Sequence, residues 1–140
     1  MLSPVLLFGL EADRLNIAKT IELTKKLKAG YEVNDEAVID YISTAEQMVL
    51  TDIVRGREGA AEIINSYGDY DLSTDRETEL FAPPPYDVLY AQYAATQIDL
   101  LAEDGDRYLN DMAVFRDTFT DLKRYWWQTH RQTKNYAFHV

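Results

Sequence analysis

Residues 106–134 read DRYLNDMAVFRDTFTDLKRYWWQTHRQTK, and this stretch decides the fold. Apolar and aromatic residues recur in it at alternating steps of four and three positions, namely Tyr108, Met112, Phe115, Phe119, Leu122 and Trp126. Such a heptad spacing places all of these side chains on one stripe of an α-helix. We therefore expect a long helix that packs against a helical core by this stripe.

The sequence before this stretch predicts three more helices. Residues 15–30 carry an imperfect apolar stripe that ends at Gly30, and residues 34–56 start with Asn34 as a helix cap. Residues 86–105 form another apolar helical pattern, and only AEDGD separates it from the last helix, so these two should pair antiparallel. We predict an all-α fold, a small bundle with four main helices.

Between the second and third of these helices lies a long connection, REGAAEIINSYGDYDLSTDRETELFAPPPY, residues 57–86. Its Gly, Asp, Ser and Pro residues predict mostly irregular structure, with at most a short apolar turn. A loop of this length in a compact domain is usually functional or disordered.

Composition sets the broad class of the protein. The chain has 140 residues, a net charge of -10 and no cysteine, which indicates one domain without disulfides. It lacks an apolar run of membrane-spanning length and a signal-peptide pattern, so we expect a cytosolic protein and no membrane partner. An acidic chain with only a mildly basic end does not favour binding nucleic acid through its phosphates.

The residues that usually carry catalysis are scarce. His130 and His139 are the only histidines, and the glycines stand singly, so that neither a nucleophilic triad nor a phosphate-binding loop is indicated. Acidic pairs at helical spacing could hold Mg²⁺, although a solvated face or an ion pair is the favoured interpretation; they are Glu36 with Asp40, Asp99 with Glu103, and Asp117 with Asp121. We predict no catalytic, cofactor-binding or metal residues and no enzyme.

Two features suggest buried or interface positions. Asp99 lies among apolar residues and should need a partner, for which Arg107 is the candidate. Trp126 continues the heptad, whereas Trp127 points about 100° away from it. Trp127 should therefore be covered by the long loop, by the first helix or by another subunit, and the intrachain and intersubunit interpretations both remain open.

Several pieces of this chain together resemble a known protein family. The pieces are TELFAPPPYDVLY, QIDL, DRYLNDMAVF and WWQTH, within a match over roughly residues 15–131. The chain resembles the head-tail connector or adaptor proteins of tailed bacteriophages and prophages. That resemblance implies a helical connector domain, residues 1–131, followed by an extended C-terminal arm, residues 132–140.

The resemblance also implies a function and partners. Such proteins form a homo-oligomeric ring, commonly of twelve subunits, that lies beneath the portal protein in the virion neck and extends the DNA channel toward the tail or a second connector (stopper) protein. Synthesis would occur in the host cytoplasm, and DNA would pass without specific binding. The implied portal-binding arm residues are Lys134, Asn135, Tyr136, Phe138 and Val140, and the implied subunit-interface residues are Phe81, Pro84, Tyr86 and Trp127. The alternatives are a small helical metal-dependent nucleotide hydrolase and a phage regulatory binding module.

Overall fold

The computed structural model describes residues 14–133, and this part of the chain is all-α, as predicted. Its α-helices are α2 (Ile17–Leu27), α3 (Asp35–Val49), α4 (Ala60–Ser66), α5 (Leu89–Leu101) and α6 (Gly105–Thr129). A π-helical turn, η2 (Leu50–Val54), prolongs α3, and a 3₁₀ turn, η3 (Tyr86–Val88), leads into α5. Within residues 14–133 no strand forms, and none of the helices is both long and apolar enough to cross a membrane.

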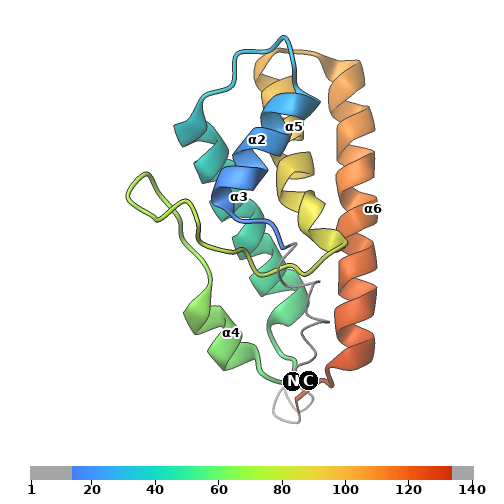
Figure 1. Cartoon of the computed structure of the whole chain (residues 1–140). Helices are drawn as coiled ribbons and strands as arrows, with labels where there is room; N and C mark the ends of the chain where they lie inside the picture. The colour runs from blue at the N-terminus through green and yellow to red at the C-terminus, as the bar shows by residue number, and fades with distance from the viewer. Residues whose placement is uncertain (1–13, 134–140) are drawn as a thin grey trace.

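The centre of the bundle is α5, which packs against α2, α3 and α6. Ala91, Ala94 and Ala95 are buried on α5, and their small side chains let neighbouring helices approach closely. Figure 1 shows α6 running along the edge of the molecule beside α5. The connection between these two helices is as short as the sequence predicts.

The longest helix, α6, buries a single stripe. Asp104 caps its start by accepting a hydrogen bond from the Arg107 amide at 3.3 Å. Phe115, Leu122 and Trp126 are buried, and they all belong to the heptad. Met112 and Phe119, also of the heptad, are partly buried and pack against the core. The heptad prediction is therefore confirmed.

The start and end of α3 also follow the sequence prediction. The Asn34 side chain accepts a hydrogen bond from the Ala37 amide at 3.0 Å, which satisfies one of the free amides of the first turn. In the π-helical turn that follows, the Arg55 amide donates to the Leu50 carbonyl five residues earlier. Gly56, with φ of 83°, then ends the helical path.

The connection after Gly56 contains a helix that the sequence analysis did not predict, α4. Ala60 and Ile63 of this helix pack against the core, whereas Ile64 is exposed. Because α4 spans only about two turns, its apolar residues are too few to show a helical period. The described part of the chain therefore has five α-helices where four main ones were expected, and the remainder of the connection up to Pro85 is irregular.

The irregular segment runs beside the start of α2. The Ile17 amide donates to the Thr78 carbonyl at 3.1 Å, and the Leu80 amide donates to the Leu15 carbonyl at 3.3 Å. Backbone groups of the loop that would otherwise need water are thereby satisfied within the chain.

Glu46 of α3 attaches this segment to the bundle, and its carboxylate is fully buried. Its Oε2 accepts hydrogen bonds from the Tyr70 hydroxyl at 3.0 Å and from the Phe81 amide at 2.9 Å. Its Oε1 accepts one from the Tyr90 hydroxyl of α5, which itself accepts from the Ala82 amide at 2.9 Å. One side chain thus joins two helices and the loop.

Burial dominates the titration of this network. It raises the pKa of Glu46 above the ordinary 4.5, although the hydrogen bonds from Tyr90, Phe81 and Tyr70 favour the ionised form. Burial and the adjacent Glu46 charge also raise the pKa values of Tyr70 and Tyr90. Both hydroxyls therefore stay protonated near neutral pH and can donate to the carboxylate.

Replacing Glu46 by Ala should lower the free energy of unfolding by about 3–5 kcal/mol, because several buried donors lose their common acceptor. Glu46→Gln keeps the volume and one acceptor oxygen, so its loss should be smaller. Urea denaturation followed by circular dichroism measures both values. Equal stability of Glu46→Ala and wild type would contradict the role assigned to this carboxylate.

The stability difference between Glu46→Gln and wild type should depend on pH. The pKa of Glu46 is higher in the folded state than in the unfolded state, so the folded state binds this proton more tightly. The stability gained from this proton binding is complete below pH 4.5 and is lost as the pH rises through the pKa of the folded state. The variant lacks this titration. Its free energy of unfolding, measured relative to wild type, should therefore rise with pH above about 4.5, as denaturation at a series of pH values would show.

Candidate functional site

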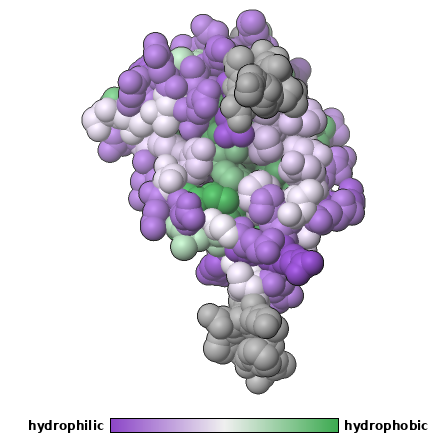
Figure 2. Space-filling view, turned by 60° about the horizontal axis from the view of Figure 1, so that its bottom comes forward, coloured by the Kyte–Doolittle hydropathy of each residue, from purple (hydrophilic) through white to green (hydrophobic). Residues whose placement is uncertain are grey.

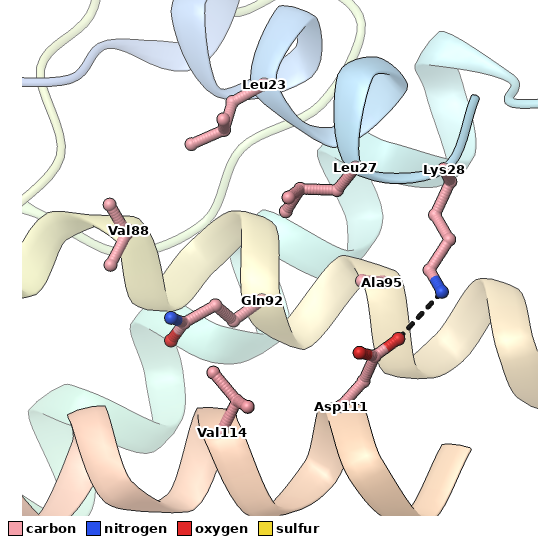
Figure 3. Close-up of a pocket in the computed structure, with 8 residues that line it drawn as sticks. All are labelled: Leu23, Leu27, Lys28, Val88, Gln92, Ala95, Asp111 and Val114. Carbon is pink, nitrogen blue, oxygen red and sulfur yellow. Dashed lines mark ion pairs between the residues drawn. The ribbon is translucent and has the colours of Figure 1, made fainter. Parts of the chain in front are cut away.

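A mostly apolar hollow of about 290 Å³ lies between α2, α5 and α6. In Figure 3, Leu23 and Val88 lie toward one end of it, Gln92 lies near the middle, and Lys28 with Asp111 forms the other end. The full lining is Leu23, Leu27, Lys28, Val88, Gln92, Ala95, Asp111 and Val114.

The polar end of this hollow is a buried ion-pair cluster. Lys28 Nζ lies 2.6 Å from Asp99 Oδ1 and 2.7 Å from Asp111 Oδ2. Lys28 and Asp99 are buried, and Asp111 is partly buried. The cluster links the end of α2 to α5 and α6, so its groups serve the packing of three helices.

The three pKa values agree with a tightly held cluster. Burial alone would lower the pKa of Lys28, but its bonds to Asp111 and Asp99 outweigh this effect and raise it. Burial, with Asp111 beside it, raises the pKa of Asp99. Burial opposes the ionisation of Asp111, but Asp99 and Lys28 lower its pKa overall. Of the two carboxyl groups, Asp99 is therefore the weaker acid.

This geometry corrects the predicted partner of Asp99. The carboxylate is buried, as expected, but its ion pair is with Lys28 and not with Arg107. The Arg107 side chain is largely exposed and lies 3.4 Å from Asp104. Arg107 is close to Asp99 along the chain but stands in the first turn of α6, where its side chain points outward.

Three consecutive aromatic residues near the end of α6 point in three directions. Trp126 points into the core, where it packs edge-on against Phe81 at 4.9 Å and stacks on His130 at 3.6 Å between ring centroids. Tyr125 stacks on Tyr86 at 5.6 Å and is 41% exposed. Trp127, 40% exposed, lies on the opposite flank of the helix.

Trp127 is held within the subunit by its polar atom, while much of its ring stays accessible. Its Nε1 donates to the Ile53 carbonyl at 2.8 Å. The Arg57 guanidinium carbon lies 4.1 Å from the ring centroid and Lys123 Nζ lies 4.5 Å from it, both within cation–π range. The intrachain contact is therefore present, and the accessible part of the ring leaves an intersubunit contact open as a prediction.

A second hollow, of about 400 Å³, opens beside Trp127. We call it the basic hollow, because Arg55, Arg57 and Lys123 line it with a single carboxylate, Asp52. The other lining residues are Thr51, Gly56, Trp127 and Gln132. Among residues 14–133, no carboxylate forms an ion pair with any of these three cations.

The other predicted interface residues occupy different environments. Phe81 is buried in the subunit's own core, where it also meets Tyr67 at 5.5 Å. Pro84 and Tyr86 are partly exposed and belong to the segment that approaches α6. The structure thus leaves accessible surface on Pro84, Tyr86 and Trp127, and little on Phe81.

The predicted portal-binding residues, 134–136, 138 and 140, lie outside the described part of the chain. The residues just before them pair with the turn after η2. The Glu58 amide donates to the Arg131 carbonyl at 2.9 Å, and the Thr133 amide donates to the Gly56 carbonyl at 3.0 Å. The chain therefore stays attached to the bundle through Thr133, two residues beyond the predicted boundary at residue 131.

Within residues 14–133, no three histidine or acidic side chains are grouped so that they could hold a metal ion. The surface in Figure 2 is largely hydrophilic, with a small apolar area near its centre.

The sequence analysis did not single out Glu46, Lys28 and Arg57. Only Glu46 carried a readable signal, because it stands four residues after Ile42 on the buried stripe of α3.

Replacing Lys28 by Met should lower the free energy of unfolding by about 3–5 kcal/mol, because Asp99 would lose its buried counter-charge. The double variant Lys28→Met/Asp99→Leu should be more stable than the single variant. Arg107→Met is the matched control and should change stability by less than about 0.5 kcal/mol. Urea denaturation of the four proteins gives the comparison, and an Arg107 effect as large as that of Lys28 would contradict it.

Comparison of this chain with protein-family models, with curated proteins and with solved structures gave no match in any of the three. The family resemblance in the sequence therefore stays a prediction.

Proposed function

We propose that this chain is a structural, non-enzymatic virion protein of a tailed bacteriophage or prophage. It acts as a head-tail connector that assembles into a homo-oligomeric ring, commonly of twelve subunits, beneath the portal protein. The ring extends the DNA channel and joins the capsid to the tail or to a stopper protein in the virion neck.

The observation that carries this proposal is the uncovered surface of α6. In a helix of 25 residues, Phe115, Leu122 and Trp126 are the buried positions, while large apolar side chains outside the stripe stay exposed. These exposed side chains are Leu109, Val114, Tyr125 and Trp127. Aromatic residues that are anchored within a subunit but keep an accessible face are typical of protein interfaces. Neighbouring subunits of a ring would cover them.

Two further properties support the same role. A net charge of -10 suits a channel through which DNA slides without adhering, because like charges repel. Tyr136, Phe138 and Val140 alternate along the sequence, as side chains do when an extended peptide binds a partner. We assign portal binding to the arm that they form with Lys134 and Asn135.

Removing the arm tests the proposal directly. A chain truncated after Thr133 keeps the described contacts with Gly56 and Glu58, so its circular dichroism and melting temperature should match those of the full chain. Coexpressed with the portal protein of the same phage or prophage, it should no longer copurify with the portal.

Point variants sharpen this test. Tyr136→Ala/Phe138→Ala should abolish copurification with the portal, whereas His139→Ala, at the intervening position, should not. Failure of the full-length chain to bind the portal would refute the proposed function. Retained binding by the truncated chain would refute the arm assignment alone.

A further inference from the structure

The cations of the basic hollow have few polar contacts within the described chain. Of the side-chain donors on Arg57, one makes a hydrogen bond in the described structure, a long one from Nη1 to the His130 carbonyl at 3.4 Å. Arg55 and Lys123 form no ion pair with any carboxylate among the described residues. On a chain with a net charge of -10, a hollow lined by three cations and one carboxylate is complementary to an anionic partner.

The same chain carries a matching acidic protrusion. Residues 69–79, which we call the acidic loop, contain exposed carboxylates at Asp69, Asp71, Asp75, Glu77 and Glu79. The one cation in this loop, Arg76, is already paired with Asp35 at 2.9 Å. The loop therefore presents excess negative charge.

Internal hydrogen bonds hold the acidic loop in one shape. Asp71 Oδ1 accepts from the Ser73 amide at 2.9 Å, and Asp75 Oδ1 accepts from the Glu77 amide at 2.9 Å. A loop that is already ordered loses less conformational entropy when it binds. The carboxylates of Glu77 and Glu79 have no described side-chain partner and remain available.

The acidic loop lies away from the part of α6 that lines the hollow. Figure 1 shows the loop projecting at the left, whereas α6, whose C-terminal half carries Lys123 and Trp127, forms the right edge. No ion pair joins the two within the described chain. A contact between them must therefore join two copies, and such a head-to-tail contact produces a ring when its rotation closes.

We infer that the basic hollow receives the acidic loop of a neighbouring copy of this chain, with Arg55, Arg57 and Lys123 facing Glu77 and Glu79. This inference rests on the proposed function, in which the subunits form a ring. It assigns the charged contact that orients each subunit relative to the next. Electrostatic complementarity of this kind fixes orientation and excludes wrong pairings.

Two other occupants fit the hollow less well. The chain's own residues 134–140 contain Lys134 and no acidic side chain, so their charge does not complement the hollow. Nucleic acid requires an extended basic face, whereas three cations around about 400 Å³ suit one or two carboxylates.

A charge exchange between the two surfaces tests the inference. The hollow variant is Arg55→Glu/Lys123→Glu, and the loop variant is Glu77→Lys/Glu79→Lys, which spares the acidic residues that shape the loop. Sedimentation velocity and light scattering of the full-length chain over a range of concentrations measure self-association. Glu22→Lys/Asp117→Lys, two exposed positions elsewhere, is the matched control for the charge change of the loop variant.

We expect each of the two variants alone to self-associate about tenfold or more weakly than wild type, because the reversed surface repels its partner. An equimolar mixture of the two should recover wild-type assembly, since each hollow then meets a loop of opposite charge. The chain with all four substitutions should recover it as well, and the control should behave as wild type. High salt should weaken the wild-type contact.

The outcomes separate this inference from the function on which it rests. Wild-type assembly by both variants, or no recovery in the mixture, would overturn the loop-to-hollow contact while leaving the ring in place. A wild-type chain that stays monomeric at every concentration, alone and with portal, would overturn both. Binding of duplex DNA that is lost in the hollow variant, without any self-association, would also overturn the inference and assign the hollow to nucleic acid.

Discussion

The fold depends on one constraint, the buried carboxylate of Glu46 and the donors that surround it. A charge-bearing group removed from water must be matched by hydrogen bonds, and here the donors come from α5, from the loop and from the loop backbone. Because Glu46 accepts from the Phe81 amide, it also sets where Phe81 enters the core. Phe81 in turn packs on Trp126, so the path of the loop and the placement of α6 are linked through a single side chain of α3.

The Lys28 cluster performs the corresponding task at the far end of α2. It joins α2 to α5 and α6 through charges that are matched within the bundle. Both polar clusters connect elements that are distant in the sequence, and each contains a fully buried carboxylate, Glu46 in one and Asp99 in the other. On the flanks of α6, Tyr125 and Trp127 each make a contact within the subunit and keep an accessible face.

Sequence analysis predicted well what depends on local pattern. The heptad located α6, the cap at Asn34 located α3, and the stop at Gly56 located the end of η2, because periodicity, capping and positive φ act within a few residues. It predicted that Asp99 is buried but chose the wrong partner, since Lys28 approaches only through the packing of α2. It missed α4 because a helix of two turns shows no period. The basic hollow combines residues from η2, the following turn and α6, and no spacing along the chain indicates that combination.

The neighbouring tryptophans Trp126 and Trp127 report on different surroundings. Trp126 is stacked on His130 in the core, whereas Trp127 sits at the rim of the basic hollow with part of its ring in water. Indole emission shifts with the polarity of its surroundings, so the two side chains form a natural pair of fluorescent probes. The intrinsic fluorescence of Trp126 therefore reports whether the core is intact, and that of Trp127 reports whether the rim of the basic hollow is covered.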